Sequence, residues 1–293
     1  MNIAPVNGID ICYETFGEPT DPAVLLVMGF TAQMTAWGDE FCEALAAADR
    51  HVIRFDNRDC GLSSKFDGIA VDMAALMMAQ AGLGEAPPAP YTLSDMADDG
   101  FGLLTHLGLD AAHLVGASMG GMIVQTMAIE LPERVLSMTS MWSTTGNPEY
   151  LDSTPEAMAA LLAPPPEDRE AFIDSAELSR VWGSPKYFDL ELARQRAAES
   201  FDRSFYPEGA SRQLAAMAAS GDREAGLALL DLPTLVIHGM ADTLIKPSGG
   251  VRTAELVPGS TLLQFKDMGH DLPKPLAPLV IDALVSHTTH RVV

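Results

Sequence analysis

The chain has 293 residues, 47% of them hydrophobic, which suffices for one large α/β domain or a core domain with an inserted subdomain. Forty acidic residues against eighteen basic ones give a formal net charge of −22, so we expect neither nucleic acid nor a membrane as a partner, and we favour uncharged substrates. Three cysteines without a CxxC pair argue against a disulfide framework or a zinc site. No signal peptide and no apolar run of about 18 residues is visible, which favours a cytoplasmic location.

The predicted elements alternate between strands and helices, after an initial hairpin that turns at Asn7-Gly8. Short apolar runs that end in glycine or polar residues predict buried strands at Ala23–Phe30, from His51 into a polar turn ending at Ser63, and at Ala112–Ser118, Val135–Ser143, Thr234–Asp242 and Ser260–His270. Helical periodicity lies between them at Glu40–Ala48, Ser94–Leu107, Gly121–Leu131, Ser248–Leu256 and Pro278–Thr288. This alternation predicts an α/β fold, with a mostly parallel twisted sheet, helices on both faces and the hairpin as an antiparallel edge.

Two regions interrupt this alternation. Residues 66–91 form an insertion rich in Met and Pro, which we interpret as a small flap. Residues 144–228 contain amphipathic helical patterns and the break "APPPED", with no convincing strand, and we interpret them as an inserted helical cap. The core would then comprise residues 1–143 and 229–293.

The stretch "GASMGG", residues 116–121, lies between a predicted strand and a predicted helix. It matches G-x-S-x-G, in which a serine sits on a strained strand-to-helix turn and the flanking positions must lack side chains. A serine that merely caps the helix is the plainer interpretation. The context of the motif favours Ser118 as a nucleophile.

A serine nucleophile needs a base and an acid that orients the base. Among the seven histidines, His270 follows Gly269 at the end of the last predicted strand, whereas His51, His113 and His238 fall inside strands, where a buried structural role is expected. Asp242 ends the preceding strand, so its carboxylate points along the same edge of the sheet. We therefore predict Ser118, Asp242 and His270 as the catalytic triad.

The ordered motifs "LLVMGF", "IRFDNRDCGLS", "VGASMGGMIVQ" and "MGHDLP" resemble the α/β-hydrolase superfamily over nearly the whole chain. Within it they most resemble the esterase branch around aclacinomycin methylesterase-type enzymes. The resemblance implies an α/β-hydrolase fold and an oxyanion hole formed by the backbone N–H groups of Phe30 and Met119. Many relatives carry His-Gly where this chain has Met28-Gly29, a difference that leaves a backbone donor intact.

Other polar and apolar residues near these motifs are expected to support the site. Asp56, Arg58 and Asp59 are expected to hydrogen-bond neighbouring loops rather than to catalyse. Thioethers adapt to irregular pockets, and we expect the substrate to contact a set of four residues, Gly29, Met34, Met78 and Trp142. No phosphate loop and no metal-ligand spacing is visible, so we expect no cofactor and no metal.

These observations predict a serine carboxylesterase that acts through an acyl-enzyme on uncharged, partly apolar small esters. The same triad serves carbon–carbon bond hydrolases, lactonases and cofactor-free perhydrolases, which sequence barely separates from esterases. A small-ligand receptor with residual turnover is the alternative from a different class. A serine rather than a carboxylate at position 118 disfavours an epoxide or haloalkane hydrolase. The sequence leaves the oligomeric state open.

Overall fold

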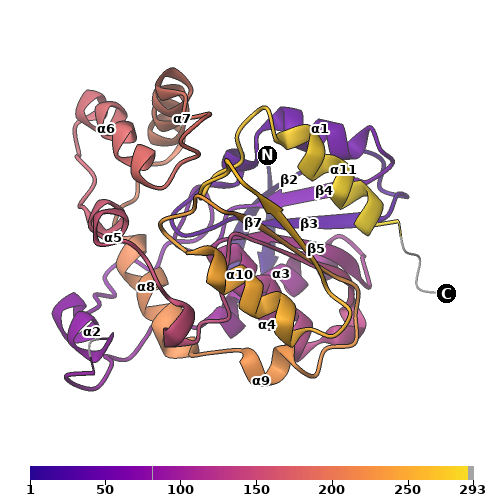
Figure 1. Cartoon of the computed structure of the whole chain (residues 1–293), viewed down its shortest axis with the longest axis horizontal. Helices are drawn as coiled ribbons and strands as arrows, with labels where there is room; N and C mark the ends of the chain where they lie inside the picture. Colours follow the sequence, from indigo (N-terminus) through magenta and orange to yellow (C-terminus); the bar gives the residue numbers. More distant parts are fainter. Residues whose placement is uncertain (81, 290–293) are drawn as a thin grey trace.

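The computed structural model describes residues 1–80 and 82–289 of the chain, and its centre is an eight-stranded sheet in the order β1-β2-β4-β3-β5-β6-β7-β8 (Figure 1). The pairs β1–β2 and β2–β4 are antiparallel, and all the other neighbours are parallel. The strands are β1 Asn2–Val6, β2 Ile9–Phe16, β3 Ala23–Val27, β4 His51–Phe55, β5 Ala112–Ala117, β6 Val135–Met141, β7 Thr234–Gly239 and β8 Thr261–Phe265. The predicted parallel sheet with an antiparallel hairpin at its edge is confirmed.

The N-terminal hairpin turns where the sequence predicted. Asn7 and Gly8 both have positive φ values, 48° and 77°, as a two-residue type I′ turn requires. β3 and β7 are shorter than the predicted strands, because the chain leaves the sheet before Phe30 and before Asp242. Both residues therefore lie in loops beyond the carboxyl ends of their strands.

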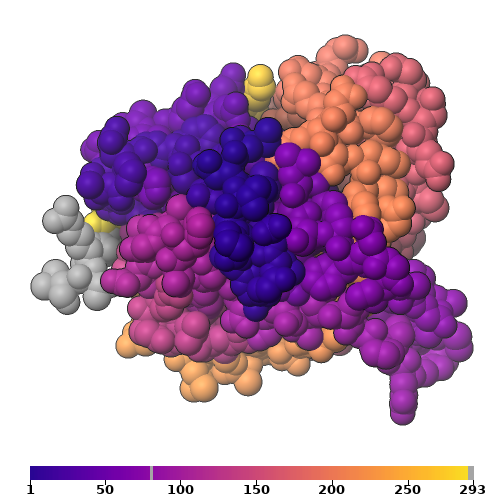
Figure 2. Space-filling view, turned by 180° about the vertical axis from the view of Figure 1, so that it is seen from behind, coloured from indigo at the N-terminus to yellow at the C-terminus, as the bar shows by residue number. Residues whose placement is uncertain are grey.

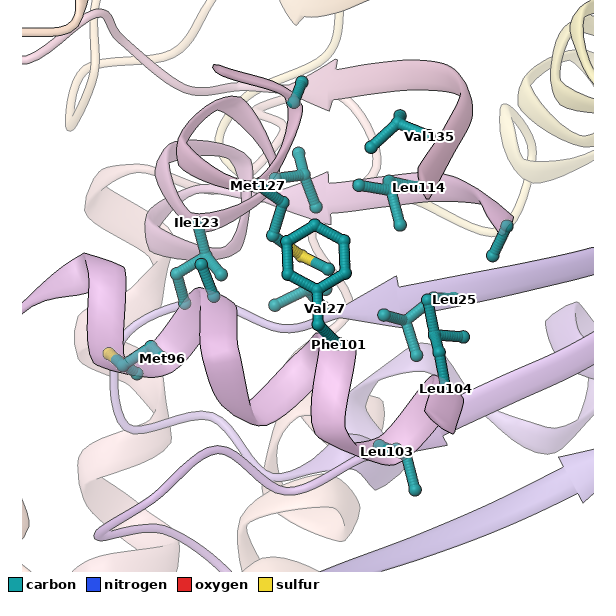
Figure 3. Close-up of a cluster of buried hydrophobic side chains, with 14 of the residues drawn as sticks. Leu25, Val27, Met96, Phe101, Leu103, Leu104, Leu114, Ile123, Met127 and Val135 are labelled. Carbon is teal, nitrogen blue, oxygen red and sulfur yellow. The ribbon is translucent and has the colours of Figure 1, made fainter. Parts of the chain in front are cut away.

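Helices cover both faces of the sheet (Figure 1). Their bounds are α1 Asp39–Ala46, α2 Met73–Gln80, α3 Leu93–His106, α4 Met119–Glu130, α5 Pro155–Leu162, α6 Arg169–Ser175, α7 Leu190–Arg203, α8 Gly209–Ser220, α9 Glu224–Leu227, α10 Pro247–Leu256 and α11 Ala277–His287. On one face α3 and α4 pack with the sheet in a large apolar cluster, part of which is drawn in Figure 3. On the other face α1 and α11 close a second cluster. The two clusters fix the sheet between two helical layers.

The two predicted insertions differ from this layered core. Residues 144–228 contain α5 to α9 and short 3-10 helices, with no strand, and α5, α6 and α7 lie to one side of the sheet (Figure 1). The segment around α2 projects from the body of the molecule (Figure 2). Within the described ranges, no helix combines the length and the hydropathy needed to cross a bilayer.

Candidate active site

Ser118 sits on the turn between β5 and α4. Its backbone has φ 56° and ψ −119°, a region that residues other than glycine rarely occupy. Such strain persists only where the surrounding structure enforces it, and it raises the serine hydroxyl above the carboxyl end of the sheet. The Ser143 hydroxyl donates to the Ser118 carbonyl at 2.7 Å and fixes the turn from the neighbouring strand.

The glycines around Ser118 allow three backbone segments to approach closely. A Cβ atom on Gly116 would lie 2.1 Å from the Gly120 carbonyl oxygen. A Cβ on Gly120 would lie 2.1 Å from the carbonyl oxygen of Val27, which ends β3. No side chain fits at either position. The G-x-S-x-G pattern is thus the direct consequence of packing the ends of β3 and β5 against the start of α4.

His270 connects Ser118 to Asp242. Its Nε2 atom is 2.9 Å from Ser118 Oγ, and its Nδ1 atom is 2.7 Å from Asp242 Oδ2. Because a carboxylate only accepts hydrogen bonds, Nδ1 carries the proton and Nε2 is the acceptor that faces the serine hydroxyl. The backbone N–H of His270 donates to the Trp182 carbonyl at 2.7 Å, so the helical insertion helps to hold the loop. The three residues have the geometry of a nucleophile, a base and an orienting acid.

Asp242 is buried and fully hydrogen-bonded. Its Oδ1 atom accepts the backbone N–H groups of Leu244 and Ile245 at 2.9 and 3.0 Å, and Oδ2 accepts from His270. His238 Nε2 donates to the Ile245 carbonyl at 2.8 Å and lies 3.5 Å from Asp242 Oδ2. Burial acts to raise the pKa of this carboxyl, but the neighbouring His270 and His238 lower the pKa to about 2. Asp242 is therefore ionised at neutral pH.

Phe30 and Met119, the residues expected to form the oxyanion hole, belong to the two segments that meet at Ser118. The loop after β3 passes so close that a Cβ on Gly29 would be 3.0 Å from Ser118 Cβ. Asn57 Nδ2 donates to the Met28 carbonyl at 2.8 Å and anchors this loop. Among the described residues, no protein acceptor meets the N–H of Phe30 or that of Met119, the first residue of α4. An N–H that binds an anionic oxygen has to be free of such a partner, so this observation is compatible with the expected oxyanion hole.

Ser118 and His270 open into a cavity of about 630 Å³. Residues from the core and the insertion line it together, among them Phe30, Trp37, Phe41, Trp142, Trp182 and Leu244. A second cavity of about 700 Å³ shares Phe30, Thr31 and Leu161 with the first. Its further walls include Met73, Met77, Phe172, Phe201, Phe205 and Leu214.

The structure distributes the four expected substrate contacts unevenly. Gly29 and Trp142 line the first cavity, and the Trp142 ring lies edge-on to that of His270, 6.4 Å between centroids. Met34 and Met78 line neither cavity, which corrects that expectation. Met34 is fully buried, and its N–H donates to the Asp56 carboxylate at 2.7 Å. Met78 lies on the projecting α2 with half of its surface exposed, 51%.

The charged residues of "DNRDCGLS" hold neighbouring segments, as predicted. Asp56 pairs with Arg203 of α7 at 2.8 Å. Arg58 pairs with Asp99 of α3 at 2.7 Å. In the same way Asp59 receives two hydrogen bonds from Arg212 of α8, at 2.8 and 2.9 Å. The partners lie far away in sequence, so no local pattern could identify them.

Among the described residues, no group of three or more His, Cys, Asp or Glu side chains is arranged to hold a metal ion.

Comparison with known proteins identifies the fold family. The model of the alpha/beta hydrolase fold family matches residues 22–273. The chain belongs to this family.

Curated relatives of this α/β-hydrolase include rhodomycin D methylesterases. The one from Streptomyces sp. (strain C5) is 30% identical over 94% of this chain and 93% of its own length. Its counterpart from Streptomyces peucetius is 29% identical over the same shares. The resemblance to the methylesterase branch is thereby confirmed.

Solved structures agree with the fold. The enol-lactonase from Burkholderia xenovorans superposes with a TM-score of 0.74 at 23% identity, over 99% of this chain and 100% of that one. The esterase from Rhodococcus sp. gives 0.75 at 21% identity, over 99% and 98%. At these identities the two structures establish the α/β-hydrolase fold and not the reaction.

Proposed function

We propose that this α/β-hydrolase is a serine hydrolase of carboxylic esters. The observation that carries the proposal is the continuous chain of hydrogen bonds from Ser118 through His270 to the ionised Asp242, at the wall of a cavity. The N–H groups of Phe30 and Met119, which meet no acceptor among the described residues, would complete the set of parts that acyl transfer requires. The methylesterase relatives point to the same reaction.

In the proposed reaction, His270 Nε2 takes the Ser118 proton as Oγ attacks the ester carbonyl. The N–H groups of Phe30 and Met119 bind the resulting oxyanion, each contributing about 3–4 kcal/mol of transition-state stabilisation. His270 then returns the proton to the departing alcohol, which leaves an acyl-enzyme. Water, deprotonated by the same imidazole, attacks the acyl carbonyl and releases the acid and free Ser118. Asp242 keeps the proton on Nδ1 and stabilises the imidazolium in both halves.

Substrates would enter between the core and the helical insertion. We assign residues 144–228 as the cap, residues 66–91 as a smaller flap, and residues 1–143 and 229–293 as the core. Support comes from the first cavity, in which Trp182 of the insertion lies opposite core residues. The aromatic and aliphatic walls favour an uncharged, partly apolar ester. The cytoplasmic location stays a prediction.

A substrate panel tests the proposal. The purified chain is incubated between pH 6 and 9 with methyl and p-nitrophenyl esters, a lactone and a vinylogous diketone, and Ser118→Ala provides the background rate. Matching amounts of acid and alcohol from the esters, with repeated turnover, are expected. Cleavage of the diketone or lactone without any ester hydrolysis would contradict the proposal, as would a single covalent turnover.

A further inference from the structure

Thr31, the residue after the proposed oxyanion donor Phe30, has a strained backbone. Its φ value is +55°, in the left-handed region, which β-branched residues rarely adopt. Its side chain is exposed at the wall of both cavities. Because Thr31 and Phe30 share a peptide unit, relaxation of Thr31 to negative φ would turn the backbone next to the Phe30 N–H. The loop supplies one hydrogen bond of its own, from the Ala32 N–H to the Gly29 carbonyl at 3.3 Å, and contacts from outside the loop add to it.

Two side chains from outside the loop contact the Thr31 backbone: Cys60 Sγ donates to the Thr31 carbonyl at 3.2 Å, and the Thr31 N–H donates to Gln213 of α8. Its Oε1 atom accepts the Thr31 N–H at 2.8 Å, across 182 residues of sequence. Its Nε2 atom donates to the Arg58 carbonyl at 2.9 Å. One partner only donates and the other only accepts, so the amide has a single possible orientation. The side chain is fully buried, at 0% exposure, where an unmet hydrogen bond is costly.

A purely structural role, the attachment of α8 to the core, is already served by other residues. Arg212 makes two hydrogen bonds to the Asp59 carboxylate. At the other end of the helix, the Ser220 hydroxyl accepts the Leu93 N–H at 2.9 Å. What Gln213 adds is an acceptor for the Thr31 N–H, and no other described residue supplies one.

We propose that Gln213 is a positioning residue for the oxyanion hole, because it holds Thr31 in the left-handed conformation and thereby aims the Phe30 N–H at the reacting oxygen. The inference rests on the proposed function, since it assumes that Phe30 binds an oxyanion. The proposed cap, residues 144–228, would then help to position a catalytic group in addition to covering the site. A cap residue then affects the rate of the chemical step as well as substrate choice.

The first variant is Gln213→Leu, which keeps the size of the side chain and removes both hydrogen bonds. Loss of one oxyanion donor lowers kcat by about 100- to 1,000-fold in enzymes of this mechanism, so partial misplacement predicts a loss of about 10- to 100-fold. KM is expected to stay within about threefold, because Gln213 does not line either cavity. The rate of phosphonylation by a fluorophosphonate, whose P=O oxygen occupies the oxyanion position, is expected to fall by the same factor. Gln213→Asn, too short to reach both partners, is the second variant if the leucine variant does not fold.

Two controls separate positioning from attachment. Ser220→Ala removes another tether of α8 and is expected to keep kcat within about twofold, as that tether does not reach the loop. Thr31→Gly provides a background in which φ +55° is unstrained, so there the Gln213 substitution is expected to cost no more than about threefold. The inference would be overturned if Gln213→Leu lowered kcat by the same factor in the wild-type chain and in the Thr31→Gly background. It would also be overturned if the kcat of Gln213→Leu stayed within twofold of wild type. Absence of ester turnover in the wild-type chain would instead overturn the proposed function.

Discussion

In α4, directly after Ser118, every residue from Met119 to Ala128 is buried, whereas no residue of α7 in the helical insertion is buried. The first region is held by backbone atoms packed so closely that a Cβ would not fit at Gly120. The second is joined to the core by polar side chains, such as the Arg203 guanidinium on the Asp56 carboxylate. The contrast shows that close backbone packing fixes the nucleophile, whereas α7 is attached to the core through a few directed hydrogen bonds. The following substitutions test where this division holds.

The largest effect is expected at Asp242. Asp242→Asn replaces the acceptor of the His270 Nδ1–H, so the imidazole adopts the wrong tautomer and kcat falls by about 10⁴-fold, with KM little changed. Steady-state kinetics on a short-chain ester measures this. Asp267→Asn is the matched control, since this exposed carboxylate near His270 pairs only with Lys186 at the surface, and it is expected to retain full activity. A loss of less than tenfold for Asp242→Asn would remove Asp242 from the triad.

The attachment of the insertion is tested at Arg212. Arg212→Leu leaves the fully buried Asp59 carboxylate without its charged partner, and the free energy of unfolding is expected to fall by about 3–5 kcal/mol in urea titrations. Arg169→Leu is the control, because it removes a similar bidentate ion pair with Asp202 that is exposed to water. Little change in the free energy of unfolding is expected. If the two substitutions lowered the free energy of unfolding equally, burial would not determine how much these ion pairs contribute to stability.

The close packing of α4 on the end of β3 is tested at Gly120. Gly120→Ala puts a methyl group 2.1 Å from the Val27 carbonyl oxygen, and overpacking of this kind is expected to cost about 3 kcal/mol of unfolding free energy as well as esterase activity. Gly84→Ala is the matched control, because a Cβ there meets no atom within 4 Å. Normal stability of Gly120→Ala would contradict the close packing of β3 on the elbow.

The smallest effect is expected in the second cavity. Phe201→Ala removes part of its apolar wall, so KM for a bulky aryl ester is expected to rise about tenfold while kcat stays close to wild type. A small acetate ester, which does not reach that cavity, serves as the control substrate. An equal change for both esters would show that the second cavity does not bind substrate.

The same division explains what the sequence could predict. Asn7-Gly8, "GASMGG" and the strand-end positions of Asp242 and His270 are local patterns, and local patterns determine turns and sheet edges. Gln213 gave no such signal, because its partner Thr31 is 182 residues away and a buried glutamine on a helix looks like any other. Met34 and Met78 were expected at the pocket from their chemistry alone, which carries no direction. Their positions depend on the tertiary packing of the loop and of α2.

The central claim is that Ser118 is the nucleophile, and covalent labelling tests it most directly. The chain is treated with a fluorophosphonate and digested, and the adduct is located by mass spectrometry, in parallel with Ser118→Ala. One adduct is expected, on the peptide that contains Ser118, and the variant is expected to show neither adduct nor ester hydrolysis. An adduct on another residue, or ester hydrolysis by Ser118→Ala at the wild-type rate, would contradict it.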